Sequence, residues 1–159
     1  MGLLDKIKDV FKEPTKDDLI EYELYIHSAS HYQENLDKLV KKIMPINNRF
    51  IMETFNEQNM VVWKYNPCYV KHIKFEKDPK NEYDKNAIKI LGGSTLIDMA
   101  LIGYIPMENN VIFSNWMDAN KIFNTNLVIT GGEKKIIAKN NVMNDFPNYS
   151  VVLKVLIKK

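Results

Sequence analysis

"FEKDPKNEYDKNAIKI" spans residues 75–90 and places a polar segment immediately before a short apolar alternation. Pro79 favours a turn, because a proline keeps the residue before it out of the helical region. Asn81, Asp84 and Asn86 can each hydrogen-bond to nearby backbone amides, which would hold an irregular loop in one shape. The residues by themselves therefore predict a braced turn that leads into a strand.

Alternating apolar residues and turn signals predict several short strands around this turn. The expected strands cover residues 22–32, 68–77, 87–91, 99–105 and 149–158, and a hairpin across Gly131-Gly132 covers 126–139. Residues 87–91 and 99–105 should pair with each other, with their turn at Gly92-Gly93. In the last strand, the alternation predicts one apolar face, made of Val151, Leu153, Val155 and Ile157.

Two internal segments have the spacing of amphipathic helices. Residues 33–43 place Leu36, Leu39, Val40 and Ile43 on one side. A short helix after Pro106 is expected to bury Ile112, Phe113 and Trp116. Residues 50–67 are ambiguous, and we expect a helix followed by a loop there.

The first twelve residues, MGLLDKIKDVFK, also predict an amphipathic helix, with lysines and aspartates opposite its apolar face. Pro14 should end this helix, and residues 15–18 should form a hinge. The apolar face could pack on its own domain or on a partner, or it could make weak contact with a membrane surface.

Together these elements predict an α+β fold that is mainly β. We expect a small β-barrel or a curled antiparallel sheet with two or three helices packed on it. The chain has 159 residues, which suffices for one domain with its own core. The N-terminal helix and hinge should cover residues 1–18, and the domain residues 19–159.

Composition narrows the classes of partner and compartment. A net charge of +2 excludes a protein that attracts nucleic acid through its overall charge, so any such site must be local. Arg49 is the only arginine, which disfavours bidentate reading of guanine edges. Cys68 is the only cysteine, and no apolar run approaches the roughly 20 residues of a membrane span. We expect a cytoplasmic protein without a transmembrane segment.

Motifs for catalysis are missing from the sequence. Neither glycine pair opens a nucleotide-binding pattern, and no serine or cysteine lies in a nucleophile motif. His27 and His31 are four residues apart, which would suit a metal on a helix but not on the strand expected there. A calcium loop starting at Asp78 fails, because Lys80 falls at a ligand position and Lys89 replaces the bidentate glutamate. We therefore expect no enzyme, no cofactor and no metal site.

Two separated motifs resemble the signature of the HIRAN domain family. The first is DPKNEYDKNAIKI at residues 78–90, and the second is ALIGYIP at residues 100–106, after the expected hairpin. Upstream, residues 30–39 resemble the first strand of the family where it runs into the first helix. The likeness extends from Tyr22 to the C-terminus and is strongest between Asp78 and Pro106.

This resemblance implies a modified OB-like β-barrel, of the stand-alone bacterial or phage type, that binds single-stranded DNA and captures its 3′ end. Tyr83 would stack on the terminal base, and Asp84 would accept a hydrogen bond from the 3′-hydroxyl. Tyr104 would line the same pocket, and Tyr32 lies where the first strand of the family often offers an aromatic side chain. His31 lies in the region of that strand where family members that bind DNA tightly carry an arginine, and Lys74, Lys71 or His72 would meet phosphates. The implied partners are single-stranded DNA and a helicase, nuclease or other DNA-processing protein.

Two alternatives to this interpretation remain open. Asn81, Asp84 and Asn86 could do no more than tie the turn ahead of the strand. The domain could also be a protein-interaction module that serves as a scaffold while the N-terminal helix docks on a partner or a membrane surface.

Overall fold

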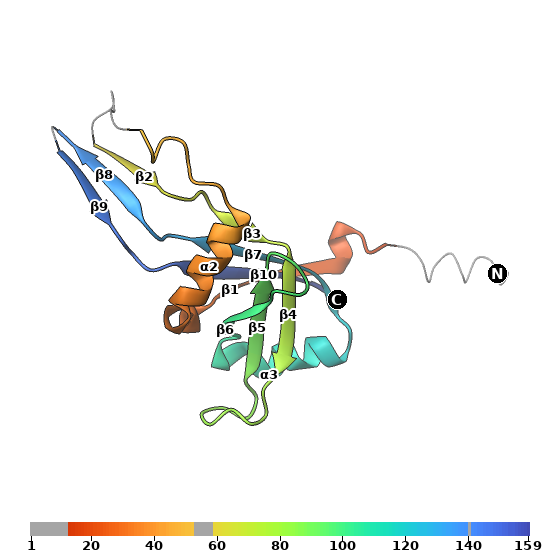
Figure 1. Ribbon diagram of the computed structural model, residues 1–159. Coiled ribbons are helices and arrows are strands. Elements are labelled where there is room, and N and C mark those ends of the chain that lie inside the picture. Colours follow the sequence, from red (N-terminus) through yellow and green to blue (C-terminus); the bar gives the residue numbers. More distant parts are fainter. Residues whose placement is uncertain (1–12, 53–58, 140) are drawn as a thin grey trace.

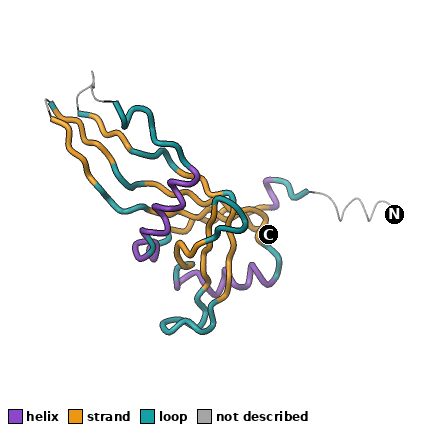
Figure 2. Tube along the Cα trace, viewed as in Figure 1, coloured by secondary structure: helices purple, strands orange, loops and turns teal. Residues whose placement is uncertain are grey.

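A computed structural model of the chain describes residues 13–52, 59–139 and 141–159 (Figure 1). These residues form three antiparallel sheets and two α-helices, accompanied by two short 3-10 helices. Figure 2 shows that strands dominate the trace. The expected α+β fold with a mainly β composition is therefore confirmed.

The largest sheet has the strand order β1-β10-β7-β3 and supplies one wall of the core. Its strands are β1 (Leu19–Tyr25), β3 (Cys68–Val70), β7 (Ile122–Thr130) and β10 (Ser150–Lys158). The predicted alternation of the last strand is confirmed, because its four odd-numbered apolar residues, Val151 to Ile157, are buried.

A second sheet, β4-β5-β6, lies between the two α-helices (Figure 1). Its strands are β4 (His72–Lys77), β5 (Ile88–Gly93) and β6 (Ala100–Tyr104). The hairpin of β5 and β6 is confirmed, but its turn is not at Gly92-Gly93, because both glycines belong to β5. The turn lies farther on, where Asp98 accepts a hydrogen bond from the Thr95 amide at 2.7 Å.

The third sheet, β2-β8-β9, extends away from the rest of the molecule (Figure 1). Its strands are β2 (Met60–Trp63), β8 (Lys134–Ala138) and β9 (Asn141–Asp145), and it has a small core of its own. Two expectations are wrong here. The end of segment 50–67 forms strand β2 rather than helix or loop, and β7 and β8 do not pair as a hairpin. Gly131 and Gly132 adopt positive φ angles of 94° and 80°, which lead the chain from one sheet into another.

The two helices fill the space beside the sheets. α2 (Gln33–Ile43) buries Leu36, Leu39 and Val40, as its spacing predicts. α3 (Met107–Asp118) follows β6 and buries Phe113 and Trp116. Ile112 is exposed, contrary to expectation, whereas Asn110 is buried.

The first predicted strand, 22–32, ends early. β1 stops at Tyr25, and residues His27–His31 form the 3-10 helix η2. This turn packs on β6, and Gly103 permits the approach, because a Cβ there would lie 2.6 Å from Ile26 Cγ2. The sequence pattern suits a strand, but packing against a neighbouring sheet decides the local conformation.

The described sheets do not close into a barrel, so the barrel form of the prediction is corrected to three open antiparallel sheets. A closed barrel needs one continuous ladder of strands, and here the ladder is interrupted between β3 and β4 and between β7 and β8. The predicted N-terminal helix lies outside the described residues, and the division at residue 18 stays a prediction. A short 3-10 helix, η1 (Lys16–Asp18), occupies the expected hinge. Within the described ranges, no helix is both long and apolar enough to span a membrane.

Candidate nucleic-acid interface

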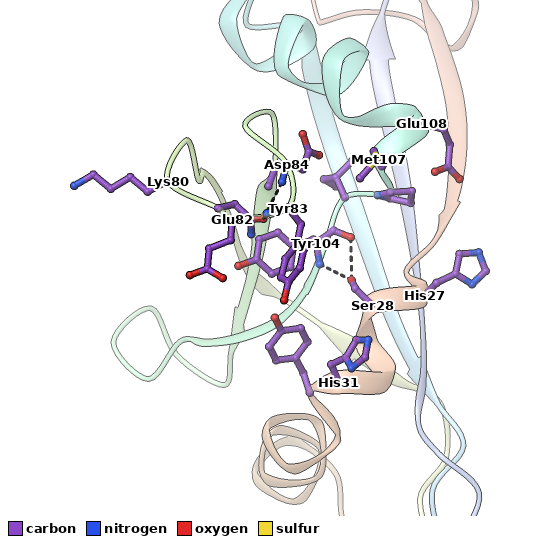
Figure 3. Close-up of a pocket in the computed structure, with 15 residues that line it drawn as sticks. His27, Ser28, His31, Lys80, Glu82, Tyr83, Asp84, Tyr104, Met107 and Glu108 are labelled. Atoms are coloured by element: carbon purple, nitrogen blue, oxygen red, sulfur yellow. Dashed lines mark hydrogen bonds between the residues drawn. The ribbon is translucent and has the colours of Figure 1, made fainter.

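A pocket of about 970 Å³ opens where three segments meet: the loop between β4 and β5, the 3-10 helix η2, and the junction of β6 with α3 (Figure 3). These segments are far apart in the sequence, and the two hairpin strands together with the Gly103 contact bring them to one place. The walls combine aromatic rings, carboxylates and histidines. Such a mixture suits a ligand that has both a flat face and polar edges.

The loop between β4 and β5 is held by its own polar side chains. Asn81 Oδ1 accepts hydrogen bonds from the amides of Tyr83 at 3.0 Å and Asp84 at 3.1 Å. Asp84 Oδ1 in turn accepts a hydrogen bond from the Asn86 amide at 2.9 Å. Asx turns of this kind stabilise an irregular backbone without help from a sheet. The loop is therefore shaped before any ligand arrives.

Tyr83 projects from this loop into solvent. Its side chain is 90% exposed, although its backbone amide is fixed by Asn81. An exposed tyrosine on a braced loop offers a flat, rigid surface, and little conformational freedom is lost when a planar ligand stacks on it.

Asp84 is half-buried beside Tyr83 and has two partners. The Asn86 amide donates a hydrogen bond to Oδ1, and Nδ2 of Asn110 on α3 donates one to Oδ2. A carboxylate has about four acceptor positions, so both oxygens can still accept a hydrogen bond from a ligand in the pocket.

Tyr104 forms part of the pocket wall with its ring, while its hydroxyl is engaged elsewhere. The hydroxyl donates to Asp78 Oδ2 at 3.1 Å, and Lys89 Nζ lies 3.8 Å from the same oxygen. Burial raises the pKa of the Tyr104 phenol to about 12, and the hydrogen bond to Asp78 acts in the same direction. The Tyr104 hydroxyl thus stays protonated and tied to the loop.

η2 closes the pocket from the other side. Ser28 Oγ accepts a hydrogen bond from the Tyr104 amide at 2.8 Å and connects η2 to the end of β6 (Figure 3). The rings of Tyr32 and Tyr104 lie 6.2 Å apart between centroids, at an angle of 44°. His31 also lines the pocket, and its side chain is exposed.

The charges of the lining residues are unevenly distributed. Three carboxylates line the pocket, on Glu82, Asp84 and Glu108, whereas Lys80 is the one lysine among its lining residues. In Figure 3 the Lys80 side chain extends away from the other lining side chains. Glu82 and Glu108 lie at opposite sides of the view in Figure 3, apart from Asp84. Carboxylates thus outnumber ammonium groups on the lining, which can accept hydroxyl or amine donors and disfavours phosphate groups near them.

Eight residues were expected to bind nucleic acid, and five of them line this pocket: Tyr83, Asp84, Tyr104, Tyr32 and His31. The three candidates for phosphate contact, Lys74, Lys71 and His72, do not. Lys74 lies on β4, where its ammonium group pairs with Glu76 at 2.8 Å. Asn81 lines the pocket as part of the braced loop, and Asn86 contributes its amide to Asp84.

Sequence reasoning missed Ser28 and Asn110. Ser28 was hidden by the expectation of a continuous strand. For Asn110 a signal exists: it precedes the buried Phe113 by three residues, so it falls on the apolar face of α3. An amide on such a face needs a partner, and Asp84 is that partner. Among the described residues, no cluster of histidine, cysteine, aspartate or glutamate side chains is suited to hold a metal ion.

Comparison with known proteins gives one match. The family model described as HIRAN domain matches residues 61–158. Neither the search of curated proteins nor the search of solved structures finds a match.

Proposed function

The chain belongs to the HIRAN domain family, and on this premise we propose that it binds single-stranded DNA at a free 3′-hydroxyl end, without catalysing a reaction. The family is known for DNA binding. The observation that carries the finer proposal is the pairing of a 90% exposed tyrosine with a neighbouring carboxylate at one pocket.

Stacking on Tyr83 would supply affinity without sequence preference. Every base has a flat face, and stacking on an aromatic side chain contributes about 1–3 kcal/mol per base. The Tyr83 ring is accessible, and the loop beneath it is braced by Asn81. The terminal base is the best candidate for this contact, because it has no next neighbour to stack on.

Asp84 would supply selectivity for the end of the strand. A free 3′-hydroxyl can donate a hydrogen bond to the carboxylate, and hydrogen bonds to a charged acceptor are stronger than neutral ones. A 3′-phosphate or a continuing strand would place negative charge there instead, which the carboxylate repels. Glu82 and Glu108 on the same lining add to this repulsion.

The acidic lining also predicts the salt dependence of binding. Affinity that arises from lysine–phosphate contacts falls with salt in proportion to the number of phosphates neutralised. Lys80 is the one lysine of the lining, so few phosphates should be neutralised. We expect a shallow slope of log affinity against log salt.

The test measures fluorescence anisotropy for three forms of one short DNA sequence: a strand with a 3′-hydroxyl, the same strand with a 3′-phosphate, and a circular strand without ends. We expect the 3′-hydroxyl strand to bind most tightly. Replacing Asp84 by Asn should bring the three affinities together. Equal affinities in the unmodified protein would refute end recognition.

A second candidate function is a protein-interaction module, and one observation favours it. The strand register of the largest sheet aligns Tyr25, Val152, Val128 and Tyr69 in one row across four strands. The tyrosines at both ends of this row are exposed, and exposed tyrosines often anchor protein interfaces. Glu23, paired with Lys154 at 3.5 Å, borders the row, so a partner with an apolar centre and a polar rim would fit.

Two variants separate the candidates. Replacing Tyr25 and Tyr69 together by Ser should abolish co-purification of a protein partner while leaving DNA affinity unchanged. If the double variant loses DNA affinity instead, the row belongs to the DNA site and the second candidate fails.

A further inference from the structure

Asn110 lies on the buried side of α3, where the other residues are apolar. It is 2% exposed and is the one buried polar residue in the described part of the chain. The other buried residues of α3, Phe113 and Trp116, join the main core. Burying an amide costs free energy unless it is hydrogen-bonded, so packing alone gives no reason for an asparagine here.

The hydrogen bond of Asn110 leads to the pocket. Its Nδ2 donates to Asp84 Oδ2, and the two residues are 26 positions apart in the sequence. Asp84 lines the pocket, whereas Asn110 lies behind it and does not. Asn110 therefore contacts the proposed ligand only through Asp84.

This contact limits how the Asp84 carboxylate can move. The Asn86 amide holds Oδ1 at 2.9 Å from within the loop, and Asn110 holds Oδ2 from α3. With one donor on each oxygen, the plane of the carboxylate is fixed relative to both the loop and the helix.

We propose that Asn110 is a positioning residue that sets the selectivity of the pocket for a 3′-hydroxyl over a 3′-phosphate by holding the Asp84 carboxylate in one orientation. This inference rests on the proposed function. Without Asn110, the carboxylate can rotate about its side-chain bonds. It then receives the hydroxyl less well and repels a phosphate less strongly.

The experiment uses two substitutions of similar size in the full chain, Asn110→Leu and Asn110→Asp. The first removes the donor without adding charge. The second keeps the shape but replaces the donor amide by a carboxyl group. Asn115→Asp is the matched control, because Asn115 is an exposed asparagine of α3 that does not line the pocket. Far-UV circular dichroism verifies that each variant is folded at the assay temperature.

The measured quantity is the selectivity ratio, the dissociation constant for the 3′-phosphate strand divided by that for the 3′-hydroxyl strand. At pH 8 we expect both Asn110 variants to lower this ratio about tenfold, the usual size of one hydrogen bond to a charged group. Asn115→Asp should keep the ratio of the unmodified protein. If Asn110→Asp is unfolded at pH 8, Asn110→Leu alone decides this part of the test.

A pH profile separates positioning from a merely structural role. As the pH falls toward 5, the two adjacent carboxyl groups of Asn110→Asp should share a proton, so the introduced group becomes a donor again and selectivity recovers. Asn110→Leu cannot recover. His27, His31, Glu82 and Glu108 also line the pocket in every variant, so each ratio is divided by that of the unmodified protein at the same pH.

The outcomes distinguish two failures. A ratio near one in the unmodified protein overturns the proposed end recognition, and this inference with it. If the unmodified protein has a high selectivity ratio and the folded Asn110→Leu variant keeps it, the role of Asn110 is refuted but end recognition stands. Loss of selectivity in Asn110→Leu together with acid rescue of Asn110→Asp supports the proposal.

Discussion

Two loops of the second sheet are braced in the same way but differ in the hydrogen-bond partners of their aspartates. The β4–β5 loop is braced by Asn81 and Asp84 and exposes Tyr83. The β5–β6 turn is braced by Asp98, which accepts hydrogen bonds from Ser94 and Thr95, and it exposes Leu96 and Ile97. Both loops therefore present large side chains on a fixed backbone.

The difference lies in how each loop uses its aspartate. Asp98 is occupied by its own turn and by Lys42 at 3.2 Å, and these hydrogen bonds, with that of Ser94 first, hold its pKa far below the ordinary value. Asp84 has one donor on each oxygen and lines the pocket. A braced loop therefore becomes a candidate site only where its polar group can still accept a hydrogen bond from a ligand.

The largest expected effect is on DNA affinity, and it distinguishes Tyr83 in the β4–β5 loop from Ile97 in the β5–β6 turn. Tyr83→Ala should weaken single-stranded DNA binding by roughly 5- to 150-fold, the equivalent of losing one base–aromatic stack. Ile97→Ala should leave the affinity unchanged, because Ile97 does not line the pocket. Neither variant should change the melting temperature much, since both side chains are almost fully exposed. Anisotropy titrations measure the affinities and thermal melts the stabilities. An equal loss of affinity in both variants would contradict the assignment of DNA binding to the β4–β5 loop rather than the β5–β6 turn.

The two aspartates should respond in opposite ways to replacement by asparagine. Asp84→Asn should reduce the preference for a 3′-hydroxyl end, with at most a small change in melting temperature. Asp98→Asn should lower the melting temperature and leave DNA selectivity intact, because its carboxylate braces a turn away from the pocket. If Asp84→Asn instead costs mainly stability, the loop serves only to tie the turn.

The stabilising effect of Asp98 should depend on pH. Its pKa in the folded protein is lowered, so its contribution is fully present above the unfolded value of about 3.9 and is lost as the pH falls below it. The difference in melting temperature between the unmodified protein and Asp98→Asn should therefore be constant between pH 6 and 7 and shrink below about pH 4. A difference that grows on acidification would contradict the assigned hydrogen bonds.

The smallest effect concerns the attachment of the β4–β5 loop to β6. Tyr104→Phe removes the hydroxyl that donates to Asp78, so a modest loss of stability is expected. Because the folded pKa of about 12 exceeds the unfolded value of about 10, this contribution is present below pH 10 and disappears as the pH rises through 12. Ultraviolet titration should show one late-ionising phenol fewer in the variant.

Much of the local structure could be predicted from the sequence. Helix α2, the apolar face of β10 and the β5–β6 hairpin each depend on a periodic pattern within a few residues. The braced loop could also be predicted from the sequence, because Asn81 and Asp84 accept hydrogen bonds from amides only two or three positions away. Local hydrogen bonds leave a signature in local sequence.

Elements that depend on distant partners could not be predicted. β2 gains its strand conformation by pairing with β8, more than 70 positions later. The turn of η2 requires the close approach permitted by Gly103. β7 and β8 have the pattern of a hairpin, yet each pairs with other strands. In these cases tertiary packing outweighs the preference of the isolated segment.

The braced loop, the tyrosine beside an aspartate and the resemblance to a family could all be recognised in the sequence, since all three are properties of adjacent residues. That η2 and the start of α3 complete a pocket around this loop follows from the three-dimensional arrangement alone. It alone joined Asn110 to Asp84. The reason is that a pocket is made by segments far apart in the chain, and burial and strand pairing, which act over the whole molecule, bring those segments together.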